Sequence, residues 1–199
     1  MTPISISRGN TKLGKMPNIS LPPIVTCEPG AMCAKSGLCY ALKSYRAYPN
    51  VRDAWSRNLS VWEEDPKSFE TQLENFLTEN NPEYFRWHVG GDIPDMAYAK
   101  MMLRVARNHH GINFLAYTKR RFVIESDQIA GNVPPNLALV LSSWPGQPIY
   151  NPHGLPVAYV DDGTETRIPD NAHRCEGSCA NCHVCWYLHG NWSVAFPLH

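Results

Sequence analysis

The pattern of apolar and polar positions along the chain alternates between two periods, which predicts strands separated by helices. Four segments have the short, apolar composition of strands: 84–89 (YFRWHV), 113–118 (NFLAYT), 137–142 (LALVLS) and 156–160. Segment 137–142 is nearly all apolar, as is typical of a strand that is buried on both faces. Segment 18–26 (NISLPPIVT) is also β-rich, but Pro22 and Pro23 interrupt it, so we expect a short or edge strand there.

Helices are predicted before and between these strands. The expected helical segments are 40–48, 53–63, 66–78, 96–108 and, in a short form, 122–130. Segment 66–78 is the clearest, because four apolar residues recur on one helical face: Phe69, Leu73, Phe76 and Leu77. Asp95 stands where it can cap the N-terminus of segment 96–108.

Strands that alternate with helices predict an α/β fold with a parallel sheet. Right-handed crossovers wind such units into either an open parallel sheet or an incomplete (β/α) barrel. We assign this domain to residues 1–160. Residues 161–199 are expected to form an irregular, cysteine-rich C-terminal tail that packs on the same domain.

The carboxyl ends of parallel strands are where ligands bind in such folds. The candidate cofactor-binding residues at these ends are Gly90, Gly91, Asp92, Lys119 and Ser142. Each also has a purely structural interpretation. The Gly90-Gly91-Asp92 segment can be a strand-to-helix turn, Lys119 a solvated strand end, and Ser142 the residue that closes a strand. No serine–histidine–aspartate pattern, paired carboxylates or P-loop is evident.

The chain has 199 residues and a formal net charge of zero, but the charge is uneven along it. Segments 1–52 and 96–124 are basic, and segments 53–95 and 125–199 are acidic. Two interpretations stay open: segments of opposite sign pack together, or the two basic segments form a surface for nucleic acid or another anionic partner. The sequence has no apolar run long enough to span a membrane and no signal-peptide pattern, so we expect a cytoplasmic protein.

The seven cysteines form two groups, Cys27-x5-Cys33-x5-Cys39 and Cys175-x3-Cys179-x2-Cys182-x2-Cys185. An odd number cannot pair completely in disulfides within one chain, and a cytosolic location disfavours disulfides. The second group places four sulfurs within eleven residues, a spacing more typical of an iron–sulfur cluster than of zinc, which remains the alternative metal.

The first group follows the first candidate strand of the parallel sheet directly. Three cysteine ligands on a [4Fe–4S] cluster leave one iron open for a substrate or cofactor, whereas four ligands give a closed site for electron transfer or structure. The sequence therefore predicts one open and one closed cluster, or a single cluster that draws ligands from both groups.

Several of these motifs, in this order, are found together in one known family. They are Cys39-Tyr40-Ala41, Phe85-Arg86-Trp87-His88 running into Gly91-Asp92, Tyr117-Thr118-Lys119, Pro135-Asn136-Leu137, Cys185-Trp186 and Val194-Ala195-Phe196. On them, the chain resembles the "gene product eighty-eight" family of bacteriophage proteins over roughly residues 18–199. The resemblance implies a small phage protein acting in the host cytosol, and it carries no established activity.

The chain is more distantly similar to radical S-adenosylmethionine (SAM) enzymes, which have a partial barrel and a three-cysteine loop after the first strand. Cys27, Cys33 and Cys39 match that loop in place, and Gly90, Gly91 and Asp92 match the motif that contacts SAM. The cysteine spacing differs from the usual x3 and x2. This similarity implies an iron–sulfur redox enzyme that uses SAM. The alternative is a non-enzymatic iron–sulfur or zinc module that contacts nucleic acid or a host protein.

Overall fold

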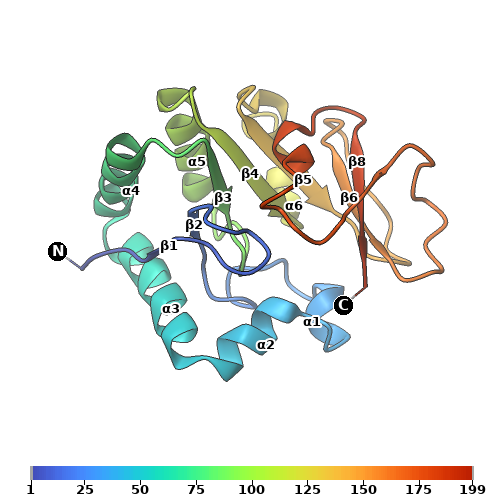
Figure 1. Cartoon of the computed structure of the whole chain (residues 1–199), viewed down its shortest axis with the longest axis horizontal. Helices are drawn as coiled ribbons and strands as arrows, with labels where there is room; N and C mark the ends of the chain where they lie inside the picture. The colour runs from blue at the N-terminus through green and yellow to red at the C-terminus, as the bar shows by residue number, and fades with distance from the viewer. Residues whose placement is uncertain (1, 199) are drawn as a thin grey trace.

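The computed structural model describes residues 2–198 (Figure 1). Its strands are β1 (Ile6–Ser7), β2 (Asn18–Ile19), β3 (Tyr84–Trp87), β4 (Asn113–Thr118), β5 (Leu137–Ser142), β6 (Val157–Asp161), β7 (His173–Arg174) and β8 (Ser193–Pro197). Its helices are α1 (Met32–Lys35), α2 (Tyr40–Ala47), α3 (Pro49–Glu64), α4 (Pro66–Asn80), α5 (Met96–Asn108) and α6 (Arg121–Ile124), with short 3-10 helices η1 (Ala130–Asn132) and η2 (Val184–Tyr187). Among the described residues, no helix is both long and apolar enough to cross a membrane.

The strands form one open sheet in the order β1-β2-β3-β4-β5-β6-β8-β7. Only β1 is antiparallel to its neighbour, and the other adjacent pairs are parallel. From β2 to β6 the strands lie side by side in chain order, so each connection leads to the next strand along the sheet. The predicted α/β fold with a mostly parallel, unclosed sheet is confirmed.

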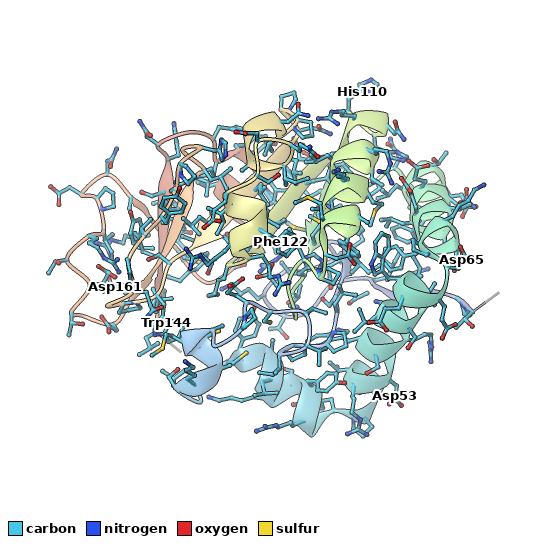
Figure 2. All side chains as sticks on the ribbon, turned by 180° about the vertical axis from the view of Figure 1, so that it is seen from behind. Asp53, Asp65, His110, Phe122, Trp144 and Asp161 are labelled. Atoms are coloured by element: carbon cyan, nitrogen blue, oxygen red, sulfur yellow. The ribbon has the colours of Figure 1, made fainter. Side chains whose placement is uncertain are left out.

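The helices α5 and α6 cover one face of this sheet, and Figure 2 shows both in front of it. The predicted helix cap is present, because Asp95 Oδ1 accepts a hydrogen bond of 2.8 Å from the backbone nitrogen of Tyr98. Asp95 Oδ2 also accepts one of 2.7 Å from Trp62 Nε1 of α3. The Tyr98 and Trp62 rings meet edge to face at 4.8 Å, so this cap also fixes α5 against α3.

The opposite face, which we call the inner face, is covered by parts of the chain far apart in sequence. Its core contains Leu115 and Val140 from the sheet, Leu13 from the N-terminal segment, and Trp186 from η2. Trp186 is buried, and its Nε1 donates a hydrogen bond of 3.2 Å to the carbonyl oxygen of Phe85. The N-terminal segment and the C-terminal region therefore close the inner face together.

Charged segments of opposite sign pack against each other, as one of the two charge interpretations expects. Arg104 of α5 makes two hydrogen bonds, of 3.0 and 2.8 Å, to the Glu70 carboxylate of α4. Asn108 of α5 bonds Glu74 in the same way, at 2.6 Å. The basic segment 96–124 thus lies partly neutralised beside the acidic segment 53–95.

Several expected elements differ in the structure: the strand expected at 84–89 ends at Trp87, and the helix expected at 53–63 begins earlier, at Pro49. The strand expected at 18–26 is confined to Asn18–Ile19, because Pro22 and Pro23 have no N–H to extend the ladder. The helix expected at 122–130 is divided into α6 and η1. The region expected as an irregular tail instead contributes β7, η2 and β8, and β8 pairs with β6 over five residues.

Candidate functional site

The carboxyl ends of β2, β3, β4 and β5 lie along one edge of the sheet, because these strands are parallel and adjacent. Beyond these ends lie Cys27 after β2, Gly90 to Asp92 after β3, Lys119 after β4, and Ser142 at the end of β5. The predicted collection of site residues at one edge therefore follows directly from the observed register.

Three thiols of the first loop, Cys27, Cys33 and Cys39, come together at this edge, and we call them the thiol triad. A hydrogen bond from the Cys33 thiol raises the pKa of Cys33 and lowers the pKa of Cys39 to about 6. Cys27 interacts electrostatically with both partners, and burial raises its pKa. The folded loop thus places these cysteines near one another, although five residues separate each from the next.

The start of α2 holds one member of the thiol triad in place. Cys39 is the N-cap residue of α2, and its Sγ accepts a hydrogen bond of 3.4 Å from the backbone nitrogen of Leu42. Backbone N–H groups at a helix N-terminus favour a negative charge, so this position stabilises a thiolate.

Lys119 brings a positive charge to the thiol triad. Its ammonium group lies near Cys27 and Cys33 and favours the thiolate form of both. Lys119 Nζ also donates a hydrogen bond of 2.9 Å to Ser142 Oγ on the neighbouring strand. The two predicted residues Lys119 and Ser142 therefore act as a pair, and the pair spans the ends of β4 and β5.

Asp92 joins the ends of three neighbouring segments. Its side-chain oxygens accept hydrogen bonds from the backbone nitrogens of Lys119, at 2.9 Å, and Ile93, at 2.8 Å. Its own backbone nitrogen donates one of 3.1 Å to Thr26 Oγ1, next to the first cysteine. Burial raises the pKa of Asp92. Asp92 is thus buried at this edge of the sheet, and both of its carboxyl oxygens already accept backbone hydrogen bonds.

The two glycines before Asp92 allow close packing. A Cβ on Gly90 would lie 2.2 Å from the Trp55 ring, and one on Gly91 would lie 2.5 Å from the carbonyl oxygen of Leu21. Gly91 also has a φ of +75°, which disfavours a side chain. The structural interpretation of these glycines is therefore sufficient to explain both.

Arg120 is a residue of this site that the sequence does not reveal. Its guanidinium donates hydrogen bonds of 2.6 Å to the carbonyl oxygen of Cys27 and 3.0 Å to that of Pro94. It lies over the Phe122 ring at 4.7 Å. The adjacent backbone nitrogen of Arg121 donates to Glu28 Oε2 at 3.1 Å. These contacts fasten the cysteine loop to the end of β4.

A cavity of about 490 Å³ borders the loop that carries the thiol triad. It is lined by residues 28–32 of the loop, by residues 144 and 147–150, and by Lys119, Ser142 and Ser143, among others. The Ser143 Oγ is buried and has no hydrogen-bond partner in the described structure.

The second group, Cys175, Cys179, Cys182 and Cys185, lies on the inner face, and we call it the C-terminal thiol group. Cys179 interacts electrostatically with Cys175 and Cys182, and Cys185 with Cys175 and Cys179. Burial raises the pKa of Cys185 to about 11. Within each of the two groups, the cysteines therefore lie near one another.

Within residues 2–198, no three His, Cys, Asp or Glu side chains are already arranged around the position of a single metal ion. The seven cysteines are free thiols. The thiols of each group are thus neighbours, and a metal centre would require their side chains to close in.

The fold and the edge define a class: an α/β protein with an open, mostly parallel sheet, with three cysteines in the loop that borders a cavity at the carboxyl ends of its strands. The chain belongs to the Gene product 88 family, whose family model matches residues 4–145. The matched region contains the thiol triad and Lys119 and ends before the C-terminal thiol group. No curated protein and no solved structure matches the chain, so the resemblance to radical SAM enzymes has no support from these comparisons.

Proposed function

We propose that the thiol triad holds a [4Fe–4S] cluster with one open iron, and that the protein is a redox enzyme acting on a small molecule bound in the adjacent cavity. The observation that carries this proposal is the meeting of three thiols, rather than four, beside a cavity at the carboxyl edge of the sheet. Three thiolate ligands leave one iron of such a cluster without a protein ligand.

Two groups beside the thiol triad favour negatively charged sulfur, whereas burial and the Asp92 carboxyl raise the pKa of Cys27. Lys119 brings a cation to Cys27 and Cys33, and the N-terminus of α2 favours the Cys39 thiolate. Hydrogen bonds and positive charge around the sulfurs are among the means by which a protein tunes the potential of an iron–sulfur centre. Asp92 and Arg120 position the start of the loop, because the Asp92 backbone nitrogen bonds Thr26 Oγ1 and the Arg120 guanidinium bonds the Cys27 carbonyl oxygen.

The cavity has the size and chemistry of a small-molecule site. Lys119, Ser142 and Ser143 line it where the strands end, and Trp144 and Tyr150 add aromatic surface. Further polar groups come from Glu28, Arg121, Glu125 and Gln147. SAM is the cofactor that we propose for it, since the consecutive parallel strands also suit an incomplete (β/α) barrel. The cluster would supply one electron at a time, from a low-potential one-electron donor, and the chain would position the cofactor.

The first experiment is anaerobic purification of the full chain, followed by visible absorption and counts of iron, sulfide and zinc. A triple Cys27→Ser, Cys33→Ser, Cys39→Ser variant is expected to contain about four irons and four sulfides fewer per chain than the parent. Circular dichroism of both proteins controls for folding. Equal iron in the two proteins, or no iron in the parent, would contradict the proposal.

SAM is then added to the reduced parent protein while the electron paramagnetic resonance of the cluster is recorded. A changed spectrum is expected on binding. Transfer of one electron to SAM would break a carbon–sulfur bond, so methionine is expected together with 5′-deoxyadenosine, whose additional hydrogen atom comes from the substrate or the medium. Lys119→Met is expected to weaken binding, and Arg104→Met, an exposed position on α5, serves as the matched control. A cluster-containing protein that neither binds nor cleaves SAM would leave the non-enzymatic module as the function.

A further inference from the structure

The C-terminal thiol group is held on the inner face by backbone hydrogen bonds from two directions. The backbone nitrogen of Cys175 donates a hydrogen bond of 2.9 Å to the carbonyl oxygen of Ala195 in β8. The backbone nitrogen of Cys179 donates one of 2.8 Å to the carbonyl oxygen of Lys12. Cys185 lies in η2 and is buried beside Trp186. β8, the N-terminal segment and η2 thus hold three members of the C-terminal thiol group on the inner face.

Two cations face these sulfurs without a carboxylate partner. Arg86 of β3 and Lys12 both lower the pKa of Cys179, and Arg86 also lowers the pKa of Cys185. Among the ion pairs of the described residues, neither Arg86 nor Lys12 takes part. Both lie over aromatic rings instead, Arg86 at 5.0 Å from Tyr117 and Lys12 at 5.2 Å from Phe196.

Arg86 is the more informative of the two cations. Its Nε atom is buried and has no hydrogen-bond partner. A buried charge is costly unless an opposite charge or hydrogen bonds compensate it. The thiols of Cys179 and Cys185 are near enough to this cation to supply negative charge, as is the Tyr117 hydroxyl. A negative charge on the two thiols would compensate the charge of Arg86.

Hydrogen-bond donors also surround the sulfurs. The backbone nitrogen of Gly177 donates to Cys175 Sγ at 3.4 Å, and His173 Nε2 lies 3.4 Å from Cys182 Sγ. The Tyr117 hydroxyl bonds Cys185. Such outer contacts orient the ligands of a metal and stabilise their thiolate form.

We propose that the C-terminal thiol group binds a closed four-thiolate metal centre with a net charge of 2−, which Arg86 and Lys12 neutralise. A divalent ion such as Zn²⁺ with four thiolates has this charge, and so does a [4Fe–4S]²⁺ cluster. With four protein ligands the centre has no open position, which suits it to structure or electron transfer. This centre is separate from the thiol triad and does not depend on the function proposed for it.

The test uses the triple variant Cys27→Ser, Cys33→Ser, Cys39→Ser, which leaves the C-terminal thiol group as the metal site of interest. It is expected to purify with about one zinc and no colour, or with about four irons and four sulfides and a brown colour. Adding Cys179→Ser to this variant is expected to abolish that metal while circular dichroism shows a folded sheet. A triple variant without zinc or iron, even after reconstitution with either, overturns the proposal.

The role of the cations is tested by Arg86→Met, which keeps much of the side-chain volume and removes the charge. Loss of an outer-shell contact typically weakens metal affinity by about 10–100-fold, so metal transfer to a chelator is expected to be faster by about tenfold or more. Arg104→Met removes an exposed arginine that is paired with Glu70, and it is expected to leave the transfer rate unchanged. Equal rates in Arg86→Met and the parent would refute the charge compensation.

Discussion

Asp92 Oδ2 accepts a hydrogen bond of 2.9 Å from the backbone nitrogen of Lys119, and this contact joins the ends of β3 and β4. A second bond, from Ile93 N to Asp92 Oδ1, forms the turn that leads toward α5. One carboxylate thereby satisfies two backbone donors that would otherwise be left without partners at the edge where the thiol triad lies.

Removing this carboxylate is expected to destabilise the whole edge. Asp92→Ala leaves two N–H groups unpaired, and we expect the free energy of unfolding to fall by about 2–4 kcal/mol. Asp92→Asn keeps one acceptor oxygen, so its free energy of unfolding is expected to fall by less than that of Asp92→Ala. Urea unfolding of both variants under anaerobic conditions measures the difference. Two variants as stable as the parent would show that the contact contributes little.

Alanine at Gly91 is expected to be far more disruptive than alanine at a glycine with similar backbone geometry. Gly91 and Gly163 have φ values of +75° and +82°, but a Cβ meets a backbone oxygen 2.5 Å away only at Gly91, and nothing within 4 Å at Gly163. Both substitutions place alanine at a positive φ, so the difference between their losses of unfolding free energy measures the clash alone. We expect this difference to be about 1–3 kcal/mol or more. Thermal or urea unfolding of the pair provides the measurement, and similar losses would argue against a tight contact.

Asn136 is expected to tolerate alanine better than aspartate. Its side-chain Nδ2 lies within hydrogen-bond distance of three carbonyl oxygens, those of Ala106 at 2.8 Å, His109 at 3.1 Å and Ile112 at 2.9 Å. Asn136→Ala removes the donor, at a cost of about 1–3 kcal/mol. Asn136→Asp replaces the donor by a charged acceptor facing three carbonyls, and is expected to cost more at neutral pH. Urea unfolding of the two variants tests this, and Asn136→Ala is expected to have the higher midpoint. A higher midpoint for Asn136→Asp would mean that the Asn136 amide is not a donor here.

His88 is expected to make the protein less stable in mild acid. Burial lowers the pKa of His88 to about 3, from an ordinary value of 6.5. Between these values the unfolded chain binds a proton that the folded chain does not, so stability rises with pH across that window. The slope for one such group approaches roughly 1.4 kcal/mol per pH unit.

His88→Asn is therefore expected to flatten the dependence of unfolding free energy on pH between about pH 6 and 4.5. Asparagine suits this position because the residue has a φ of +53°. His110→Asn, at an exposed position, is the control and is expected to keep the parent slope. Parallel curves for His88→Asn and the parent would mean that the imidazole is protonated in the folded protein.

The regular centre of the fold is predictable from the sequence, because local patterns determine it. Segments 113–118, 137–142 and 96–108 have the bounds expected of β4, β5 and α5. Their apolar periodicity is a property of consecutive residues. The short strands β1, β7 and β8 are different, since each depends on a partner strand distant in the chain, and two to five residues carry too little pattern to reveal them.

The candidate site was predictable in its residue types but not in its supporting contacts. Cys27, Lys119 and Ser142 are placed at one edge by strand order, which the alternation of elements implies. Arg120 reaches the Cys27 carbonyl across 93 positions of sequence, a contact that no local signal encodes. His88 also departs from simple strand alternation, because its positive φ turns the side chain toward Tyr98 and the helical layer.

The sheet has a consequence for how this family can be handled experimentally. The family model ends at residue 145, yet β6, β8 and β7 follow that residue and continue the same hydrogen-bonded sheet. A fragment cut at that boundary would turn β5 into an exposed edge strand and uncover Leu115, Ala138 and Val140, whose present neighbours include Trp186 and Val194. Edges of this kind template aggregation. The end of the family match is therefore not the end of a folding unit, because the matched region depends on the strands that follow it to cover its edge and its inner face.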